Sequence, residues 1–186
     1  NSLLKGDDSQ LLLLKNADGA LAESCISWGG VNLTGADWLD HIKLAEKVLA
    51  KGKYFFCYPK EPGTFDSGSG LGSGALNAAA RLYTLGSAFL MTDTSSQGKF
   101  YYGPAELTEL EGTSLSQKVN YFPEYKIPLG DPTTARYTLG TYFWGRDFTN
   151  GLVVVNADPT VTNSFPAVQD YQEVTIDKVV FTKDSS

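Results

Sequence analysis

The chain has few of the residues that mark a metal, nucleic-acid or membrane protein. It holds one histidine and two cysteines among 186 residues, and the spacing of Cys25 and Cys57 fits no metal site. Its 15 basic residues form no run and are outnumbered by 21 acidic ones, giving a net charge of -6. No apolar stretch approaches the roughly 20 residues that span a bilayer. We therefore expect no metal or cofactor, no nucleic-acid partner and no membrane contact.

What is present suits a folded domain. Apolar residues make up 42% of the chain and aromatic residues 12%, which is enough to bury a core. The sequence does not begin with methionine, as expected of a processed or truncated product.

The first 110 residues predict a parallel α/β sheet. Segments 20–24, 53–58 and 87–92 have strand character, and the second and third are apolar enough to be covered on both faces. Helical spacing of apolar residues runs over 38–49 and 75–85 between them. Strands that alternate with helices pair in parallel, because the helices serve as crossovers.

Residues 111–186 predict a second, antiparallel region. Asn150–Gly151 lies between two runs of aromatic and β-branched residues, a strong hairpin signal, and 173–182 has the pattern of another strand. We therefore treat 1–110 and 111–186 as two parts of the chain.

A glycine-rich stretch, Gly68–Gly74, precedes the second helix, and Asp93 follows it by about 20 residues. This order is typical of a dinucleotide site. However, nine residues that include Pro59 and Pro62 separate the stretch from the strand that ends at Tyr58, and it contains no lysine. We expect it to be a substrate-side loop that binds no nucleotide.

The predicted strand ends carry the candidate site residues. Glu23, Tyr58 and Asp93 lie at the carboxyl ends of the three strands, the edge that holds the chemistry of (β/α)8 barrels. Glu23 and Asp93 are the candidate catalytic carboxylates, and Trp28 and Tyr58 are candidate platforms for sugar rings. The alternative for Glu23 is an acid hydrogen-bonded at a strand end, and the alternative for Asp93 is a helix cap or turn residue.

Other polar and aromatic residues have structural interpretations. The spacing of Trp38 and Trp144 favours core positions, and His41 is expected on the helix surface. Arg146 is expected in a structural ion pair. Cys25 and Cys57 follow neighbouring predicted strands at similar depth, so either a disulfide or two buried thiols fits. Thr34 and Asp37 fit a capping box at the first helix.

Four short segments carry a family resemblance: "ADGALAES", "ARLYTLGSAFLM", "YFPEYKIPLGDP" and "YFWGRDFTNGLVVVNADP". They resemble the C-terminal portion of glycoside-hydrolase-like (β/α)8 barrels, which a small β domain follows. The resemblance implies an incomplete barrel, represented by its last three strands, that a second chain or a missing N-terminal segment would complete.

The function that this resemblance implies is hydrolysis of polysaccharide by paired carboxylates in an extracellular or cell-surface protein. The alternative is a non-catalytic extracellular module that binds carbohydrate or assembles with itself.

Overall fold

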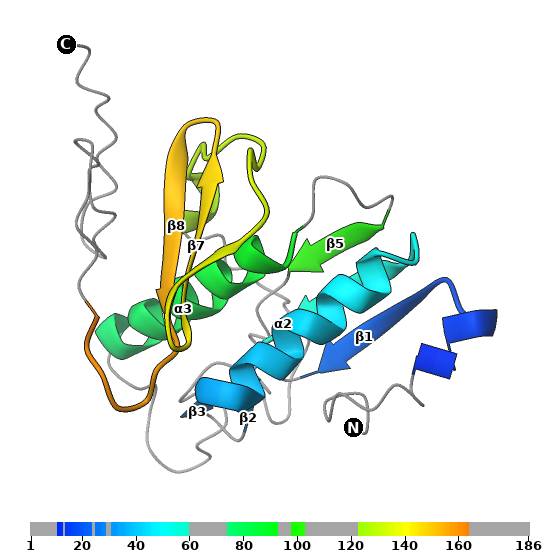
Figure 1. Ribbon diagram of the computed structural model, residues 1–186, viewed down its shortest axis with the longest axis horizontal. Coiled ribbons are helices and arrows are strands. Elements are labelled where there is room, and N and C mark those ends of the chain that lie inside the picture. The colour runs from blue at the N-terminus through cyan, green and yellow to red at the C-terminus, as the bar shows by residue number, and fades with distance from the viewer. Residues whose placement is uncertain are drawn as a thin grey trace, which may run out of the picture.

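The computed structural model describes residues 11–12, 14–23, 25–28, 31–59, 74–92, 98–102 and 123–163. Its elements follow one another along the chain (Figure 1). In order they are η2 (Leu14–Asn16), β1 (Gly19–Glu23), β2 (Ser27–Trp28), β3 (Val31–Asn32), α2 (Gly35–Leu49), β4 (Tyr54–Tyr58), α3 (Gly74–Met91), β5 (Lys99–Tyr102), η3 (Pro123–Lys126), β6 (Tyr137–Gly140), β7 (Phe143–Phe148) and β8 (Gly151–Asn156).

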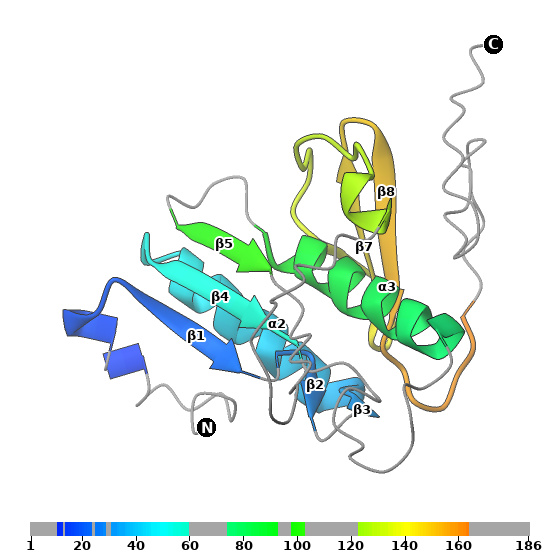
Figure 2. The ribbon, with the colours of Figure 1, turned by 180° about the vertical axis from the view of Figure 1, so that it is seen from behind.

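The first region is α/β, as the sequence predicts. Strands β1, β4 and β5 form a parallel sheet in that order, and helix α2 runs along it (Figures 1 and 2). The short antiparallel pair β2–β3 follows the end of β1. Within the described residues the three strands form an open sheet and do not close into a barrel.

In the described part of the chain only one face of β4 is buried, so the prediction of two covered faces is wrong. Phe55 and Cys57 are buried, whereas Tyr54 and Phe56 are 40% and 42% exposed. The same alternation holds in β1, where Ala20 and Ala22 are buried and Leu21 is exposed. The strand is therefore apolar on both sides but packed on one.

The third predicted strand, 87–92, is also wrong. Residues 87–91 continue helix α3, which runs without interruption from Gly74 to Met91. A glycine at position 86 suggests a helix end, yet Gly86 serves close packing, since an added Cβ would lie 3.2 Å from Cγ2 of Val155. Short apolar runs fit a buried helix as well as a strand, and periodicity alone does not separate the two.

The third parallel strand is β5, whose four residues pair with β4 from Tyr54↔Lys99 to Cys57↔Tyr102. The neighbour of β4 is therefore Lys99–Tyr102, which follows helix α3, and not the predicted segment 87–92. The alternation of strand and helix in β1, α2, β4, α3 and β5 is confirmed.

Helix α2 is amphipathic, and its buried stripe includes Trp38, Ile42 and Ala45. Thr34 has the extended dihedral angles of an N-cap residue, but its side chain makes no capping hydrogen bond, so the predicted capping box does not form. Gly52 ends the following turn with a left-handed φ of 70°.

The second region is an antiparallel sheet in the order β6–β7–β8, and the predicted hairpin is confirmed. Its turn is Thr149–Asn150, one residue earlier than predicted, because Gly151 already pairs with Phe148 as the first residue of β8. This sheet packs on α3. Arg146 of β7 is buried and donates to the carbonyls of Thr134 and Phe89 and to Oγ1 of Thr92. The predicted strand at 173–182 lies outside the described residues.

The start of β5 gives a test of its corrected position. A Cβ at Gly98 would lie 2.6 Å from the carbonyl oxygen of Leu49 and 2.7 Å from that of Lys53. Because both are backbone atoms, we expect Gly98→Ala to lower the free energy of unfolding by about 1–3 kcal/mol, measured by urea denaturation. Gly140→Ala is the matched control, since its nearest contact would be 3.6 Å. Equal effects of the two variants would contradict this placement of β5.

Candidate active site at the carboxyl edge of the parallel sheet

Strands β1 and β4 end side by side, and a disulfide joins them there. Glu23 and Tyr58 are register partners at the last position of each strand. Cys25 and Cys57 are bonded to each other with a Cα–Cα distance of 5.2 Å, which decides between the two alternatives that the sequence allows. The backbone N–H of Cys25 also donates to the carbonyl of Tyr58, at 3.2 Å. The two strand ends are thus fixed relative to each other.

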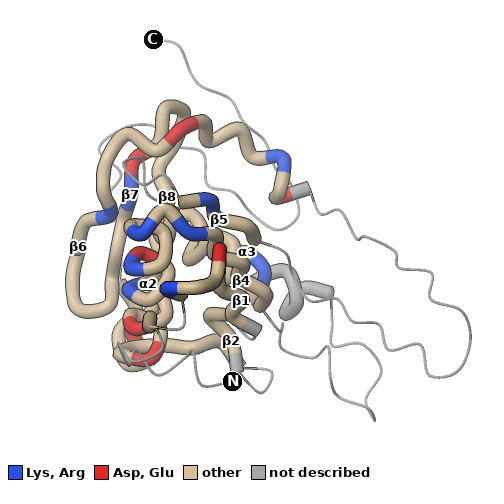
Figure 3. Tube along the Cα trace, turned by 90° about the vertical axis from the view of Figure 1, so that its right-hand side faces the viewer, with Lys and Arg blue, Asp and Glu red and all other residues tan. Residues whose placement is uncertain are grey.

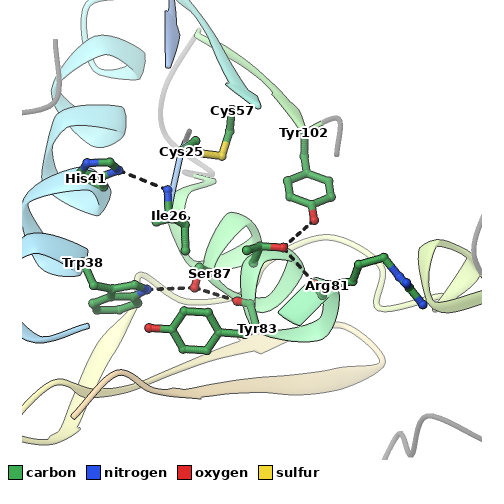
Figure 4. Close-up of a disulfide and its surroundings, with 10 residues drawn as sticks. Cys25, Ile26, Trp38, His41, Cys57, Arg81, Tyr83, Ser87 and Tyr102 are labelled. Carbon is green, nitrogen blue, oxygen red and sulfur yellow. Dashed lines mark hydrogen bonds between the residues drawn. A yellow bond between two sulfur atoms is a disulfide. The ribbon is translucent and has the colours of Figure 1, made fainter. Parts of the chain in front are cut away.

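The residue after the disulfide turns the chain sharply. Ile26 has a left-handed φ of 63°, which costs a β-branched residue on the order of 1–2 kcal/mol. Two hydrogen bonds hold it: its N–H donates to Nδ1 of His41 at 3.2 Å, and its carbonyl accepts from the N–H of Leu33 at 2.8 Å (Figure 4). This turn directs the chain from β1 into the β2–β3 pair.

His41 is buried, so its predicted surface position is wrong. Its Nδ1 accepts the Ile26 hydrogen bond, which leaves the proton of the neutral ring on Nε2. Burial lowers the pKa of His41 to about 4, although the charges of Asp37 and Asp40 act in the opposite direction. The signal for burial was present in the sequence, because position 41 follows Trp38 by three residues and adjoins Ile42 on the apolar stripe.

A second set of polar contacts joins α2 to α3 at this edge (Figure 4). Nε1 of Trp38 donates to Oγ of Ser87 at 2.8 Å, and that hydroxyl donates to the carbonyl of Tyr83, also at 2.8 Å. The predicted core position of Trp38 is confirmed, since its side chain is fully buried. Trp144 is only half-buried, and the guanidinium of Arg136 lies 4.2 Å from its ring centroid.

The tyrosines near this edge take part in structural hydrogen bonds. Tyr83 donates to the carbonyl of Leu33 at 2.6 Å, and burial raises the pKa of its phenol. The hydroxyl of Tyr102 lies 2.8 Å from Oγ1 of Thr84. The raised pKa makes the Tyr83 phenol unsuited to transfer protons near neutral pH.

The structure brings two of the four predicted site residues together. Glu23 and Tyr58 are adjacent at the ends of β1 and β4, and Trp28 belongs to the β2–β3 pair that follows. Asp93 lies outside the described residues, and the segment before it is helix, so the argument that put it at a strand end is wrong. The glycine-rich residues 68–73 also lie outside the described part.

Two polar atoms in the β2–β3 pair have no hydrogen-bond partner although they are buried. They are Oγ of Ser27 and Oδ1 of Asn32, which belong to register partners. Nothing in the sequence distinguishes Ser27.

The described residues contain no group of three His, Cys, Asp or Glu side chains that could hold a metal ion. Lys and Arg are spread over several elements (Figure 3). None of the helices in the described part is long and apolar enough to cross a membrane.

Comparison with known proteins gives no match to any family model, curated protein or solved structure.

The buried His41 predicts a pH dependence of stability. The unfolded chain takes up a proton near pH 6.5 and the folded chain only near pH 4, so the free energy of unfolding should fall as the pH drops through this window, by about 3 kcal/mol in all. His41→Asn keeps a hydrogen-bond acceptor for Ile26 but does not titrate. Urea midpoints of both proteins between pH 4 and 7 test this, and parallel curves would contradict it.

The disulfide predicts a large stability effect from loss of the cross-link. It closes a loop with a sequence separation of 32, worth about 3–4 kcal/mol by chain entropy. We expect the double variant Cys25→Ser, Cys57→Ser to lose that amount in urea denaturation. The oxidised and reduced parent proteins provide the control, and the reduced parent should match the double variant.

Proposed function

We propose that this chain is part of a glycoside hydrolase that cleaves polysaccharide with paired carboxylates, and that Glu23 is one of the pair. The observation that carries the proposal is the position of Glu23 at the carboxyl end of a parallel strand, in register with Tyr58 and next to the disulfide. In parallel α/β assemblies this edge is where catalytic residues gather.

The fold that we propose for the whole protein is a (β/α)8 barrel with β1, β4 and β5 as its last three strands. Its support is the parallel order of these strands and the helix between β1 and β4. The antiparallel sheet β6–β8 then corresponds to the small β domain that follows the barrel in the family that the sequence resembles.

The proposed chemistry needs two carboxyl groups on either side of the glycosidic bond, about 5–5.5 Å apart for retention of configuration or about 6.5–9.5 Å for inversion. Glu23 is proposed as acid or nucleophile, and Tyr58 and Trp28 as residues that contact the sugar ring. Asp93 no longer has a strand end to support it, so the second carboxylate is proposed to lie on a strand that completes the sheet.

The disulfide supports an extracellular or cell-surface location for this enzyme. Buried disulfides such as Cys25–Cys57 form and persist in oxidising compartments and are rare in the cytosol. An oxidising location is where an enzyme of polysaccharide breakdown would act.

The alternative, a non-catalytic module that binds sugars on aromatic residues, has less support. Tyr54, Phe56 and Tyr101 are exposed on the sheet, which would suit such a module. However, the rings of Phe56 and Tyr101 stack on each other at 4.9 Å with an interplanar angle of 11°. This stacking covers one flat face of each ring and so reduces the ring surface open to a sugar.

Replacement of Glu23 tests the proposed function. Glu23→Gln keeps the size of the side chain and removes its charge, so hydrolysis should fall by about 10²- to 10⁴-fold while the protein stays folded. The measurement is release of reducing sugar from a panel of polysaccharides by the protein that the complete reading frame encodes.

Glu46→Gln is the matched control. Glu46 lies on α2, away from the strand ends, and forms an ion pair with Arg136. We expect it to hydrolyse at the parent rate. The proposed function would be contradicted if Glu23→Gln hydrolysed at the parent rate, or if the parent hydrolysed none of the polysaccharides. Either result would favour the binding or self-assembling alternative.

A further inference from the structure

One face of the parallel sheet is apolar and is covered by none of the described elements. Leu21, Phe56 and Tyr101 are register partners across the three strands and are 57%, 42% and 48% exposed. Tyr54 extends this row toward the amino ends, with its ring 6.2 Å from that of Tyr101. Parallel sheets are found almost only with both faces covered.

The two faces differ in side-chain size, and this difference indicates what covers the open one. The face toward α2 carries the small residues Ala20, Ala22 and Cys57 beside Phe55, which lets a helix approach closely. The open face carries leucine, phenylalanine and tyrosine. Bulky layers of this kind fill the space between strands that face one another across a barrel.

Among the described residues β1 pairs only with β4, and the first four residues of β1 lack the usual devices that protect a sheet edge. The stretch Gly19–Ala22 contains no charge and no proline, and its register with β4 is unbroken by a bulge. By contrast, the opposite edge begins with the exposed Lys99. The edge of β1 is thus the better template for another strand.

The chain order shows where such a strand would come from. The sheet order β1–β4–β5 follows the order along the chain, so a strand beside β1 in the same series precedes it. Residues 11–12 are helical and Leu14–Asn16 form a 3-10 turn, and the buried Leu14 joins the core. This is the place of a crossover helix that leads into β1 from an earlier strand.

We propose that a strand–helix unit of the same polypeptide precedes β1 and that its strand pairs in parallel with the free edge of β1. The layer of strands that begins with this unit covers Leu21, Phe56 and Tyr101. This inference rests on the barrel proposed above and adds the surface and its occupant. A second copy of the chain fits less well. Two copies paired through their β1 edges would leave the apolar face of each sheet exposed. Two copies stacked through those faces would leave the edge of each β1 strand unpaired.

Hydrogen exchange tests the proposal by comparing the 186-residue chain with the polypeptide of the complete reading frame. In the longer protein the amides of Gly19–Glu23 should exchange at least about tenfold more slowly than in the chain alone, with β4 as internal reference. Unchanged β1 exchange would overturn the proposal. So would a reading frame that supplies no earlier strand, with native protein that is a monomer or a homodimer.

A substitution on the open face gives an independent reading. Leu21→Asp should leave the melting temperature of the 186-residue chain unchanged and lower that of the longer protein by about 5 °C or more, because only there is Leu21 covered. Val161→Asp, at a residue that is 50% exposed, is the control and should change neither. Equal effects of Leu21→Asp in both proteins would overturn the proposal.

The outcome is separable from that of the hydrolase proposal. Glu23→Gln should leave the exchange of β1 protected in the longer protein. Protection of β1 without any hydrolysis would therefore retain the strand partner and reject the enzyme.

Discussion

The Cys25–Cys57 disulfide is the constraint on which the geometry of the strand ends depends. β1 is an edge strand of five residues, and β4 is its only strand partner among the described elements. Without the cross-link its carboxyl end would be held by ladder hydrogen bonds alone. The disulfide fixes that end, and the left-handed turn at Ile26 follows directly from it. The position of Glu23 and the direction of the β2–β3 pair are therefore set by the disulfide together with the hydrogen bonds of Cys25 and Ile26.

His41 and Trp38 extend this constraint from the strand ends into the helices. His41 accepts the hydrogen bond of Ile26 from one side of α2, and Trp38 on the next turn reaches Ser87 of α3. Helix α3 in turn packs against β8, where Gly86 admits Val155. One series of contacts thus joins the parallel sheet to the antiparallel one, and residues of both belong to the same buried cluster.

The sequence predicted those elements whose signals are local. The β7–β8 hairpin, helix α2 and the alternation of strand and helix up to β4 follow from local patterns of turn residues and apolar periodicity, although the turn itself is Thr149–Asn150. The strand at 87–92 failed because an apolar run of six residues fits either state and Gly86 looked like a boundary. The place of β5 and the uncovered face of β4 depend on contacts distant in sequence, which no local pattern contains. For the site, only the adjacency of Glu23 and Tyr58 was within reach, because it follows from parallel register.

The described polar groups at the carboxyl edge are mostly engaged in structural contacts. His41 is committed to a backbone hydrogen bond and stays neutral well below neutral pH, so it is unsuited to act as a general base there. Tyr83 donates to Leu33, Tyr102 is paired with Thr84, and the two cysteines are oxidised. Nucleophilic thiol and histidine-based mechanisms are thereby disfavoured in the described part of the edge. The reaction proposed above instead depends on carboxylates, and position 23 places one at the end of β1.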